Sequence, residues 1–416
     1  MRFLPQKRRF ALFSVKFLRQ NIAFQPVFWY IYAEISGELR MLTSFSVKNF
    51  KNFEKKFTID LSKTKQYAYS EACVKDGIVK TGLIYGPNSI GKSNLGKAIF
   101  DIVQTLTDKE RTPTLYSSYA NARHPEQPVE FIYEFLFGSS RVRYEYNKLA
   151  YEDVVQEKFF VDDVEYVNRH GSEFNTKLQG TETLNGNKLI SKISAMRFIR
   201  ANAALADNPT NKTVKEFFDF VDRMLMFSNL RQSYYQGFAI GGALVDVEII
   251  KKGKLAELEE FLNSADVECK LKNLEINGQQ KMFFSFGENH FIDFWENAST
   301  GTQSLVFFFY WYMQMQDNPA IAPSFVYLDE FDAFYHEETA AKVVEKLKQV
   351  QCQVLLTTHD SNLLSNDLIR PDCAFKMLPE YKNSDSYVMG PLSSRTEKEL
   401  RQALNIPKMF RAGAFD

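Results

Sequence analysis

One short stretch constrains this chain more than any other: residues 86–93 read Gly-Pro-Asn-Ser-Ile-Gly-Lys-Ser. A glycine, four residues and then Gly-Lys-Ser form the Walker A pattern, in which glycines let consecutive backbone N–H groups point at a phosphate. The apolar run 80–85 predicts a buried strand before it, and residues 93–103 predict a helix whose N-terminal dipole favours an anion. This order predicts an α/β fold that binds a nucleoside triphosphate.

We expect the whole loop and the start of its helix to bind ATP. Lys92 is placed to reach the β- and γ-phosphates, and the Ser93 hydroxyl to ligate Mg²⁺. The alternative is a glycine-rich turn with no ligand, which the flanking strand and helix disfavour. The predicted nucleotide-binding residues of this segment are Gly86, Pro87, Asn88, Ser89, Ile90, Gly91, Lys92, Ser93 and Asn94.

A second motif follows much later in the chain. Phe-Val-Tyr-Leu-Asp-Glu at residues 325–330 is a short apolar strand that ends in two acids, which is the Walker B pattern. Asp329 is expected to hold Mg²⁺, and Glu330 stands where a general base orients the attacking water. The alternative is an ordinary strand end capped by solvated acids, and the Walker A motif makes that interpretation less favoured.

Two further segments surround the Walker B strand. Ser299 and Gly301 precede an apolar helix over 305–315, so they predict a second helix N-terminus that attracts an anion. The apolar strand predicted over 353–358 ends at His359, which is placed to contact a γ-phosphate from a loop. The first segment therefore predicts a second anion site, and the second segment predicts a residue that contacts the nucleotide.

The order of Walker A motif, Ser-x-Gly helix, Walker B strand and histidine loop resembles the ATP-binding-cassette head of the SMC and RecF kind. This resemblance implies a P-loop NTPase with a mostly parallel sheet, an antiparallel β subdomain and a helical insert. It also implies two heads that dimerise head to tail, the Ser-x-Gly motif of one closing over the triphosphate of the other. Residues 41–53 resemble the first strand and basic turn of such heads, which makes Lys51 a further nucleotide-binding candidate. Thr300 and His336 depart from the residues usual in that family.

Three short local motifs resemble one subgroup of these heads. Arg-Pro-Asp at 370–372, the form Ser-x-Gly-Thr-Gln at 299–303 and Leu-Asp-Glu-Phe-Asp-Ala at 328–333 suit the stand-alone prokaryotic ATPases of abortive infection and phage defence, such as the ATPase of the PARIS system. The resemblance implies an ATPase that forms a homodimer or larger homo-oligomer and controls a separate, operon-encoded effector of the nuclease type. The main alternative is a RecF-like repair ATPase that acts on DNA directly. A transporter subunit and a small-molecule kinase are less favoured.

The charge and the cysteine content limit which partners and metals the chain is expected to bind. The 51 basic and 51 acidic residues leave a formal net charge of zero, so the chain lacks a global basic field and any DNA contact needs a local patch. The four cysteines form no CxxC pair, which favours free thiols in a reducing cytoplasm and disfavours a structural zinc. The apolar run 22–32 is too short to span a bilayer, so we expect a cytoplasmic protein with no membrane partner.

We expect four segments along the chain. Residues 1–40 are a basic extension, interpreted as disordered or as a start-site artefact, with a DNA- or membrane-binding arm as the alternative. Residues 41–184 form an N-lobe with the Walker A motif and β-hairpins, and 185–272 a compact helical insert. Residues 273–416 form a C-lobe with the Ser-x-Gly motif, Walker B strand and histidine loop.

Two smaller features of the sequence each allow two interpretations. Gln127 suits a loop that senses Mg²⁺, but an ordinary loop glutamine is the favoured interpretation. The charged tail 395–411 predicts a helix with a solvated face, and a partner or DNA contact is the alternative.

Overall fold

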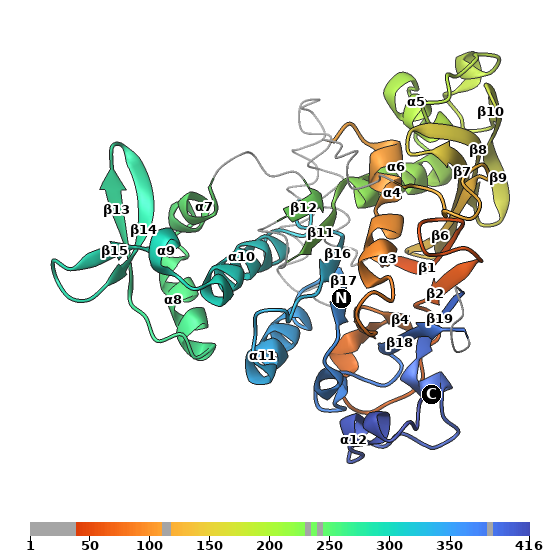
Figure 1. Cartoon of the computed structure of the whole chain (residues 1–416). Coiled ribbons are helices and arrows are strands. Elements are labelled where there is room, and N and C mark those ends of the chain that lie inside the picture. The colour runs from red at the N-terminus through yellow and green to blue at the C-terminus, as the bar shows by residue number, and fades with distance from the viewer. Residues whose placement is uncertain (1–38, 110–117, 229–233, 239–243, 381–385) are drawn as a thin grey trace, which may run out of the picture.

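The computed structural model describes residues 39–109, 118–228, 234–238, 244–380 and 386–416. Most of the predicted N-terminal extension therefore lies outside the described residues. Two seven-stranded sheets dominate the molecule, and Figure 1 shows helices α3 (Lys92–Ile99) and α4 (Asp101–Leu106) between them. The α/β fold class predicted from the sequence is confirmed.

The first sheet is mostly parallel and follows the order β12-β11-β16-β17-β5-β18-β19. Its five inner strands all run in the same direction. Because such strands are covered on both faces, their sequences are continuous apolar runs instead of alternating ones. The strands are β5 (Thr81–Tyr85), β11 (Met224–Ser228), β12 (Tyr234–Gly237), β16 (Phe325–Asp329), β17 (Gln353–Thr358), β18 (Ala374–Pro379) and β19 (Tyr387–Pro391).

The second sheet is antiparallel and follows the order β10-β9-β8-β7-β6-β1-β2. Alternating burial along β6 and β7 puts their apolar residues on the face that covers α3 and α4. The predicted β subdomain, with hairpins at β6–β7 and β9–β10, is confirmed. The strands are β1 (Arg40–Lys48), β2 (Phe57–Asp60), β6 (Val129–Phe137), β7 (Ser140–Ala150), β8 (Asp153–Val161), β9 (Val164–His170) and β10 (Glu173–Thr176).

The remaining helices flank these sheets. Helix α10 (Thr300–Met315) is buried along almost its whole length, and its Trp311 ring stacks on Phe227 of β11. Figure 1 shows α10 and α11 on the opposite face of the parallel sheet from α3. The other helices are α5 (Ala195–Asn202), α6 (Pro209–Asp222), α7 (Val245–Lys251), α8 (Leu255–Ser264), α9 (Phe294–Asn297), α11 (Glu337–Leu347) and α12 (Ile406–Arg411).

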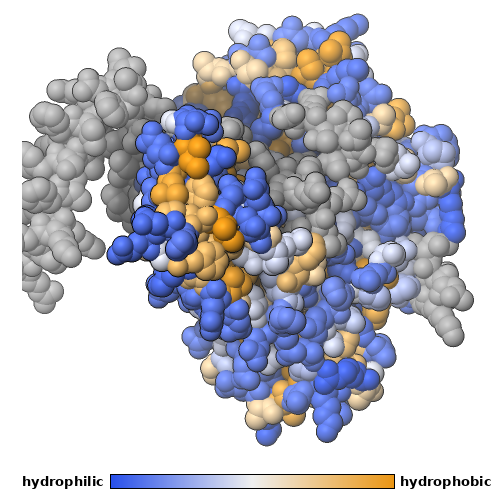
Figure 2. All heavy atoms as spheres, turned by 60° about the vertical axis from the view of Figure 1, so that its left-hand side comes forward, coloured by the Kyte–Doolittle hydropathy of each residue, from blue (hydrophilic) through white to orange (hydrophobic). Residues whose placement is uncertain are grey.

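A small third sheet forms one end of the molecule. It has the order β13 (Leu271–Ile276), β14 (Gln279–Ser285) and β15 (Phe291–Asp293), and it packs against α7, α8 and α9. Figure 2 shows apolar residues gathered at this end, where Ile276, Phe286 and Ile292 are exposed. Two short strands, β3 (Val74–Lys75) and β4 (Ile78–Val79), pair separately. None of the described helices is both long enough and apolar enough to cross a bilayer.

Residues 185–272 were expected to form a compact helical insert, but in the structure this segment is not wholly helical. Helix α6 ends at Asp222, and the next residues form β11, which pairs in parallel with β16 inside the main sheet. The sequence at 224–228 is apolar throughout, and a short apolar run of this kind does not distinguish a buried strand from a buried helix. Part of the predicted insert is therefore a strand of the mostly parallel sheet.

The tail also differs from its predicted helix. Only Ile406–Arg411 is helical, because Asn405 caps that helix through the Lys408 N–H and Pro407 occupies its first turn. Residues 395–405 form no helix.

A buried ion pair joins the two layers. Lys148 Nζ of β7 lies 2.7 Å from Asp101 Oδ1 of α4, and both side chains are almost fully buried. The hydroxyls of Tyr119 and Tyr146 also donate to the Asp101 carboxylate, at 2.7 and 2.8 Å. Because all these donors converge on one charge, removal of the lysine leaves that carboxylate undercompensated.

We therefore expect Lys148→Met to lower the free energy of unfolding by about 3–5 kcal/mol. The matched control is Lys48→Met, since Lys48 pairs with Glu130 at 2.8 Å but both side chains are substantially exposed. That change should cost about 0–1 kcal/mol. Urea denaturation of the purified proteins measures both values, and equal losses for the two variants would contradict the role given to the buried pair.

Candidate nucleotide-binding site

Three loops meet at the carboxyl edge of the parallel sheet. Gly86 follows β5, Glu330 follows β16 and His359 follows β17. Strand β17 pairs with both β5 and β16, so it brings the two Walker segments to the same edge. The Gly86 N–H also donates to the Thr358 carbonyl at 3.3 Å. In open α/β sheets this edge is where ligands bind.

The loop between β5 and α3 has the backbone shape of a phosphate cradle. Ser89 and Gly91 have φ values of 65° and 110°, in the left-handed region. A Cβ atom at Gly91 would lie 2.3 Å from Asn52 Nδ2, and one at Gly86 would lie 2.8 Å from Ile90 Cγ2. Side chains at these glycines would therefore fill the loop. The bare backbone and the start of α3 fit the triphosphate that the sequence implies.

Lys92 lies inside this loop. Its side chain is 3% exposed, and Nζ donates to the carbonyls of Gly86 at 2.6 Å and Pro87 at 3.1 Å. Burial lowers the pKa of Lys92, while the charges of Glu330 and Asp329 act in the opposite direction. The ammonium is therefore bonded to the loop's own carbonyls, and a bound triphosphate would compete with them for it. Ser93 follows in the first turn of α3.

The two Walker B acids have different surroundings. Asp329 is buried, and its Oδ1 accepts a hydrogen bond of 3.0 Å from the Thr357 hydroxyl. Glu330 is partly exposed and has a φ of 48°, a left-handed conformation that costs energy for a residue with a side chain. Burial raises the pKa of Glu330, and the charge of Asp329 raises it further. A carboxylate with a raised pKa has the stronger basicity that a general base needs.

His359 is exposed at the end of β17, and its charge influences the pKa values of Glu330 and Asp332. Asp332 is buried, accepts a hydrogen bond from the Thr358 hydroxyl, and has a pKa raised by burial. His359 therefore lies close enough to Glu330 and Asp332 to influence both acids, and its contact with a γ-phosphate stays a prediction.

The predicted Ser-x-Gly turn lies elsewhere. Ser299 caps α10 by accepting from the Thr302 N–H at 3.2 Å, and a Cβ at Gly301 would lie 3.1 Å from the Phe334 carbonyl. Figure 1 shows the start of α10 beside α8 and α9, away from α3. Within the described residues, no hydrogen bond or ion pair joins Ser299 or Gly301 to the loop 86–93. One copy of the chain therefore does not bring together the two turns that are predicted to bind anions.

Lys51 lies in a turn next to the predicted phosphate loop, and the neighbouring residue Asn52 connects this turn to the loop. Asn52 Nδ2 donates to the Ile90 carbonyl at 3.2 Å, and Asn52 Oδ1 accepts from Asn94 Nδ2 at 2.7 Å. Lys51 has a φ of 47°, and burial, with a smaller effect of nearby Lys97, lowers its pKa to about 8. The turn therefore places a cation near the start of α3.

Sequence reasoning missed three residues that shape the site. Asn52 braces the loop, Tyr327 donates its hydroxyl to the Lys92 carbonyl at 2.7 Å, and Thr357 contacts both Walker B acids. Each sits one to three residues from a motif position, which was the only signal in the sequence. Gln127 lies in an exposed turn, where its carbonyl accepts from Asn49 Nδ2 at 2.9 Å.

Arg370 and Asp372, which carried part of the subgroup resemblance, form a buried ion pair. Arg370 donates to the Asp372 carboxylate at 2.7 Å, and that carboxylate also accepts from the Lys65 N–H at 2.7 Å. The pair thus fastens the segment after β2 to the start of β18. The four cysteines are free, and three of them are buried.

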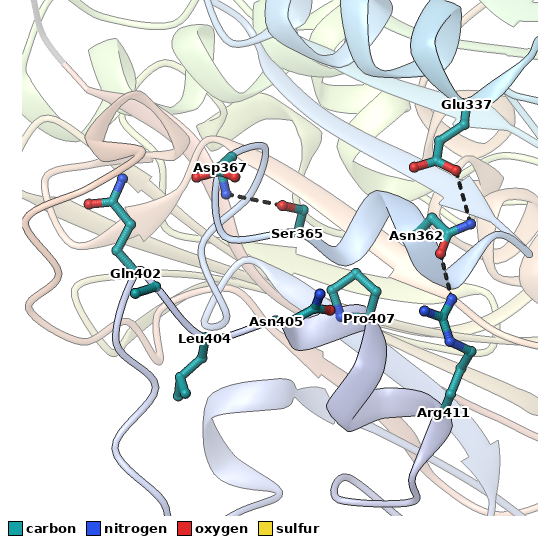
Figure 3. Close-up of a pocket in the computed structure, with 10 residues that line it drawn as sticks. Glu337, Asn362, Ser365, Asp367, Gln402, Leu404, Asn405, Pro407 and Arg411 are labelled. Atoms are coloured by element: carbon teal, nitrogen blue, oxygen red, sulfur yellow. Dashed lines mark hydrogen bonds between the residues drawn. The ribbon is translucent and has the colours of Figure 1, made fainter.

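A cavity of about 630 Å³ lies beside the segment that follows His359. Figure 3 shows Asn362 between two wall residues, since it donates to Glu337 at 3.0 Å and accepts from Arg411 at 2.6 Å. These contacts tie α12 to the start of α11. The cavity is lined by Glu337, Asn362, Ser365, Asp367, Gln402, Ala403, Leu404, Asn405, Pro407 and Arg411, and it includes no predicted site residue.

Comparison with known proteins gives one family match. The family model described as "AAA domain, putative AbiEii toxin, Type IV TA system" matches residues 83–365. No curated protein matches the chain. Among solved structures, the chain is similar to the SMC head domain from Thermotoga maritima, with 14% identity, a TM-score of 0.42, and coverage of 84% of this chain and 98% of that chain. It is also similar to the Smc head domain with an extended coiled coil bound to the C-terminal domain of ScpA, derived from Pyrococcus furiosus, with 12% identity, a TM-score of 0.42, and coverage of 86% and 98%.

Proposed function

Because this chain belongs to the AAA domain family whose description names the AbiEii toxin of type IV toxin–antitoxin systems, we propose that it is an ATP-hydrolysing switch of anti-phage defence. In this proposal two copies associate head to tail around ATP and control a separate effector protein. The observation that supports it most directly is that Lys92, Asp329 and Glu330 lie at one edge of the parallel sheet, since phosphoryl transfer needs a phosphate-binding lysine, a metal-binding acid and a residue that orients water.

The residues at this edge of the sheet would have different roles in ATP hydrolysis. The amides of the loop 86–91 and the Lys92 ammonium would hold the phosphates, while Ser93 and Asp329 would hold Mg²⁺. Bound Mg²⁺-ATP supplies the phosphoryl group and the charge of the metal. Glu330 orients a water molecule and accepts its proton, and His359 donates a hydrogen bond toward the transferred group. Lys51 adds positive charge from the neighbouring turn.

A second copy is proposed because one copy leaves the Ser-x-Gly turn unused. Ser299 and Gly301 lie at the start of a sixteen-residue helix, with Ser299 exposed and its hydroxyl acting as the helix cap. A helix N-terminus of this kind attracts anions. In a head-to-tail dimer, the turn of each copy covers the phosphates held by the other copy. Association then depends on ATP, and hydrolysis releases it.

The defence role is supported by the family description and by charge. A toxin–antitoxin system has at least two components, which fits an ATPase that acts through a partner. The formal net charge of zero gives little general attraction to DNA. A DNA-directed repair ATPase, the alternative from the sequence, is therefore less favoured.

A phage-plating experiment tests this role. Cells that carry the gene together with its operon neighbour should form fewer phage plaques, because the partner is released or activated during infection. Either gene alone, or the pair with Lys92→Ala, should give no protection. Protection that persists with Lys92→Ala would contradict an ATP-dependent switch. ATP hydrolysis by the purified protein that rises with DNA and falls steeply with salt would instead favour the repair function.

A further inference from the structure

The hydroxyl of Thr357 joins both Walker B acids. Thr357 Oγ1 accepts from the Glu330 N–H at 2.7 Å and donates to Asp329 Oδ1 at 3.0 Å. Thr357 is fully buried, and the distances are those of well-formed hydrogen bonds. One side chain on β17 therefore fixes a backbone donor and a carboxylate acceptor that both belong to the end of β16.

The backbone at Glu330 needs such a support. Its φ of 48° puts a residue with a long side chain in the left-handed region, where a conformation persists only if its surroundings hold it. This backbone turn decides where the Glu330 carboxylate points. The Phe331 N–H donates to the Thr357 carbonyl at 3.3 Å, so two consecutive amides of the turn bond to the same residue.

The neighbouring threonine does not duplicate this support. The Thr358 hydroxyl donates to Asp332 and accepts from the Asp360 N–H at 2.9 Å, so it joins the loop after β16 to the loop after β17. The two threonines point to different acids because successive strand residues face opposite sides of a sheet.

We propose that Thr357 is a positioning residue for ATP hydrolysis: its hydroxyl holds Glu330 in the left-handed conformation that aims the general base, and it orients Asp329. This inference rests on the proposed function of the site. A misplacement of about 1 Å in a catalytic group costs about a hundredfold in rate. Loss of the Thr357 hydroxyl should therefore reduce turnover far more than it reduces ATP affinity.

The test uses the full chain with Thr357→Val, which removes the hydroxyl and keeps the shape, and with Thr357→Ser, which keeps the hydroxyl. We expect the valine variant to lose about tenfold to a hundredfold in kcat while its ATP affinity changes by less than about threefold. The serine variant should retain most of the wild-type rate. Thr357→Ala is a second variant without the hydroxyl, to be used if the valine variant does not fold. Thr213→Val is the matched control, because Thr213 is buried and, among the residues that the structure describes, its hydroxyl bonds only the Pro209 carbonyl within α6.

A second measurement requires no nucleotide. Amide hydrogen exchange at Glu330 should be at least about tenfold faster in the valine variant than in wild type and normal in the serine variant. Wild-type exchange and turnover in the valine variant, or equal defects in the valine and serine variants, would overturn the inference. A wild-type protein that does not hydrolyse ATP would refute the proposed function instead, and the exchange measurement would still decide whether Thr357 holds the Glu330 amide.

Discussion

Replacing Lys92 with alanine should weaken ATP binding by about 30-fold to several thousand-fold, the factor that corresponds to the loss of one buried, hydrogen-bonded charge partner. Lys92 is 3% exposed, and its ammonium donates to the loop carbonyls of Gly86 and Pro87. Without it, the triphosphate loses its main countercharge inside the loop, and the nearby carboxylates repel the phosphates. Titration calorimetry with ATP and Mg²⁺ measures the change.

The matched control is Lys158→Ala, since Lys158 is an exposed lysine of β8 on the antiparallel sheet. This variant should bind ATP like wild type. If Lys92→Ala bound ATP as tightly as the control, the loop 86–93 would not be the nucleotide site.

The same variant tests whether two copies share each nucleotide. Lys92→Ala and Ser299→Arg should each abolish hydrolysis when studied alone. In an equal mixture, half of the dimers contain one copy of each variant, and one of their two sites is built entirely from intact residues. About a quarter of the wild-type sites should therefore be active in the mixture. A mixture that stays inactive would show that Ser299 does not act across a dimer.

Glu330→Gln should lower the rate of ATP hydrolysis by about a hundredfold to ten-thousandfold, which is the usual contribution of a general base. Glutamine keeps the size of the side chain but cannot accept the proton from water. The backbone at φ 48° is strained to a similar degree in both proteins, and the Thr357 contact uses the Glu330 amide, which the substitution leaves intact. ATP should therefore still bind, and the associated form should persist because the nucleotide is not consumed.

Phosphate release measures the rate, and light scattering coupled to gel filtration measures the mass with ATP and with ADP. Glu338→Gln is the control, because Glu338 is an exposed acid in the first turn of α11. It should hydrolyse ATP normally and show the dimer only transiently. Turnover by Glu330→Gln at the control rate would remove Glu330 from the role of base, and a monomer with ATP would argue against association driven by nucleotide.

Much of the fold follows from local sequence signals. The strand before the Walker A motif, the strand before Asp329 and the strand before His359 are continuous apolar runs, and each is a buried parallel strand in the structure. The alternation of β6 and β7 likewise predicted an antiparallel hairpin. The motif residues Lys92, Glu330 and His359 follow these three strands, which are neighbours in the sheet, and their joint role at a nucleotide stays a prediction.

What the sequence did not show depends on contacts between distant segments. Strand β11 begins two residues after Asp222, the last residue of α6, and its short apolar sequence is distinguished from a buried helix only by its pairing with β16. Asn52 lies 38 residues from Ile90 and Thr357 lies 27 from Glu330, so neither contact has a spacing rule that a sequence reveals. The side chains that hold the motif residues in place become visible only when the strands are side by side.

The position of β5 has a consequence for how the chain folds on the ribosome. This strand is synthesised early, yet both of its neighbours in the sheet, β17 and β18, come from the last quarter of the chain. Such long-range pairing slows folding, because the entropy cost of bringing distant segments together comes before the stabilising hydrogen bonds form. A nascent chain therefore carries its phosphate loop for most of synthesis without the strands that shape it. The polypeptide should acquire affinity for ATP only after β17 and β18 have been synthesised.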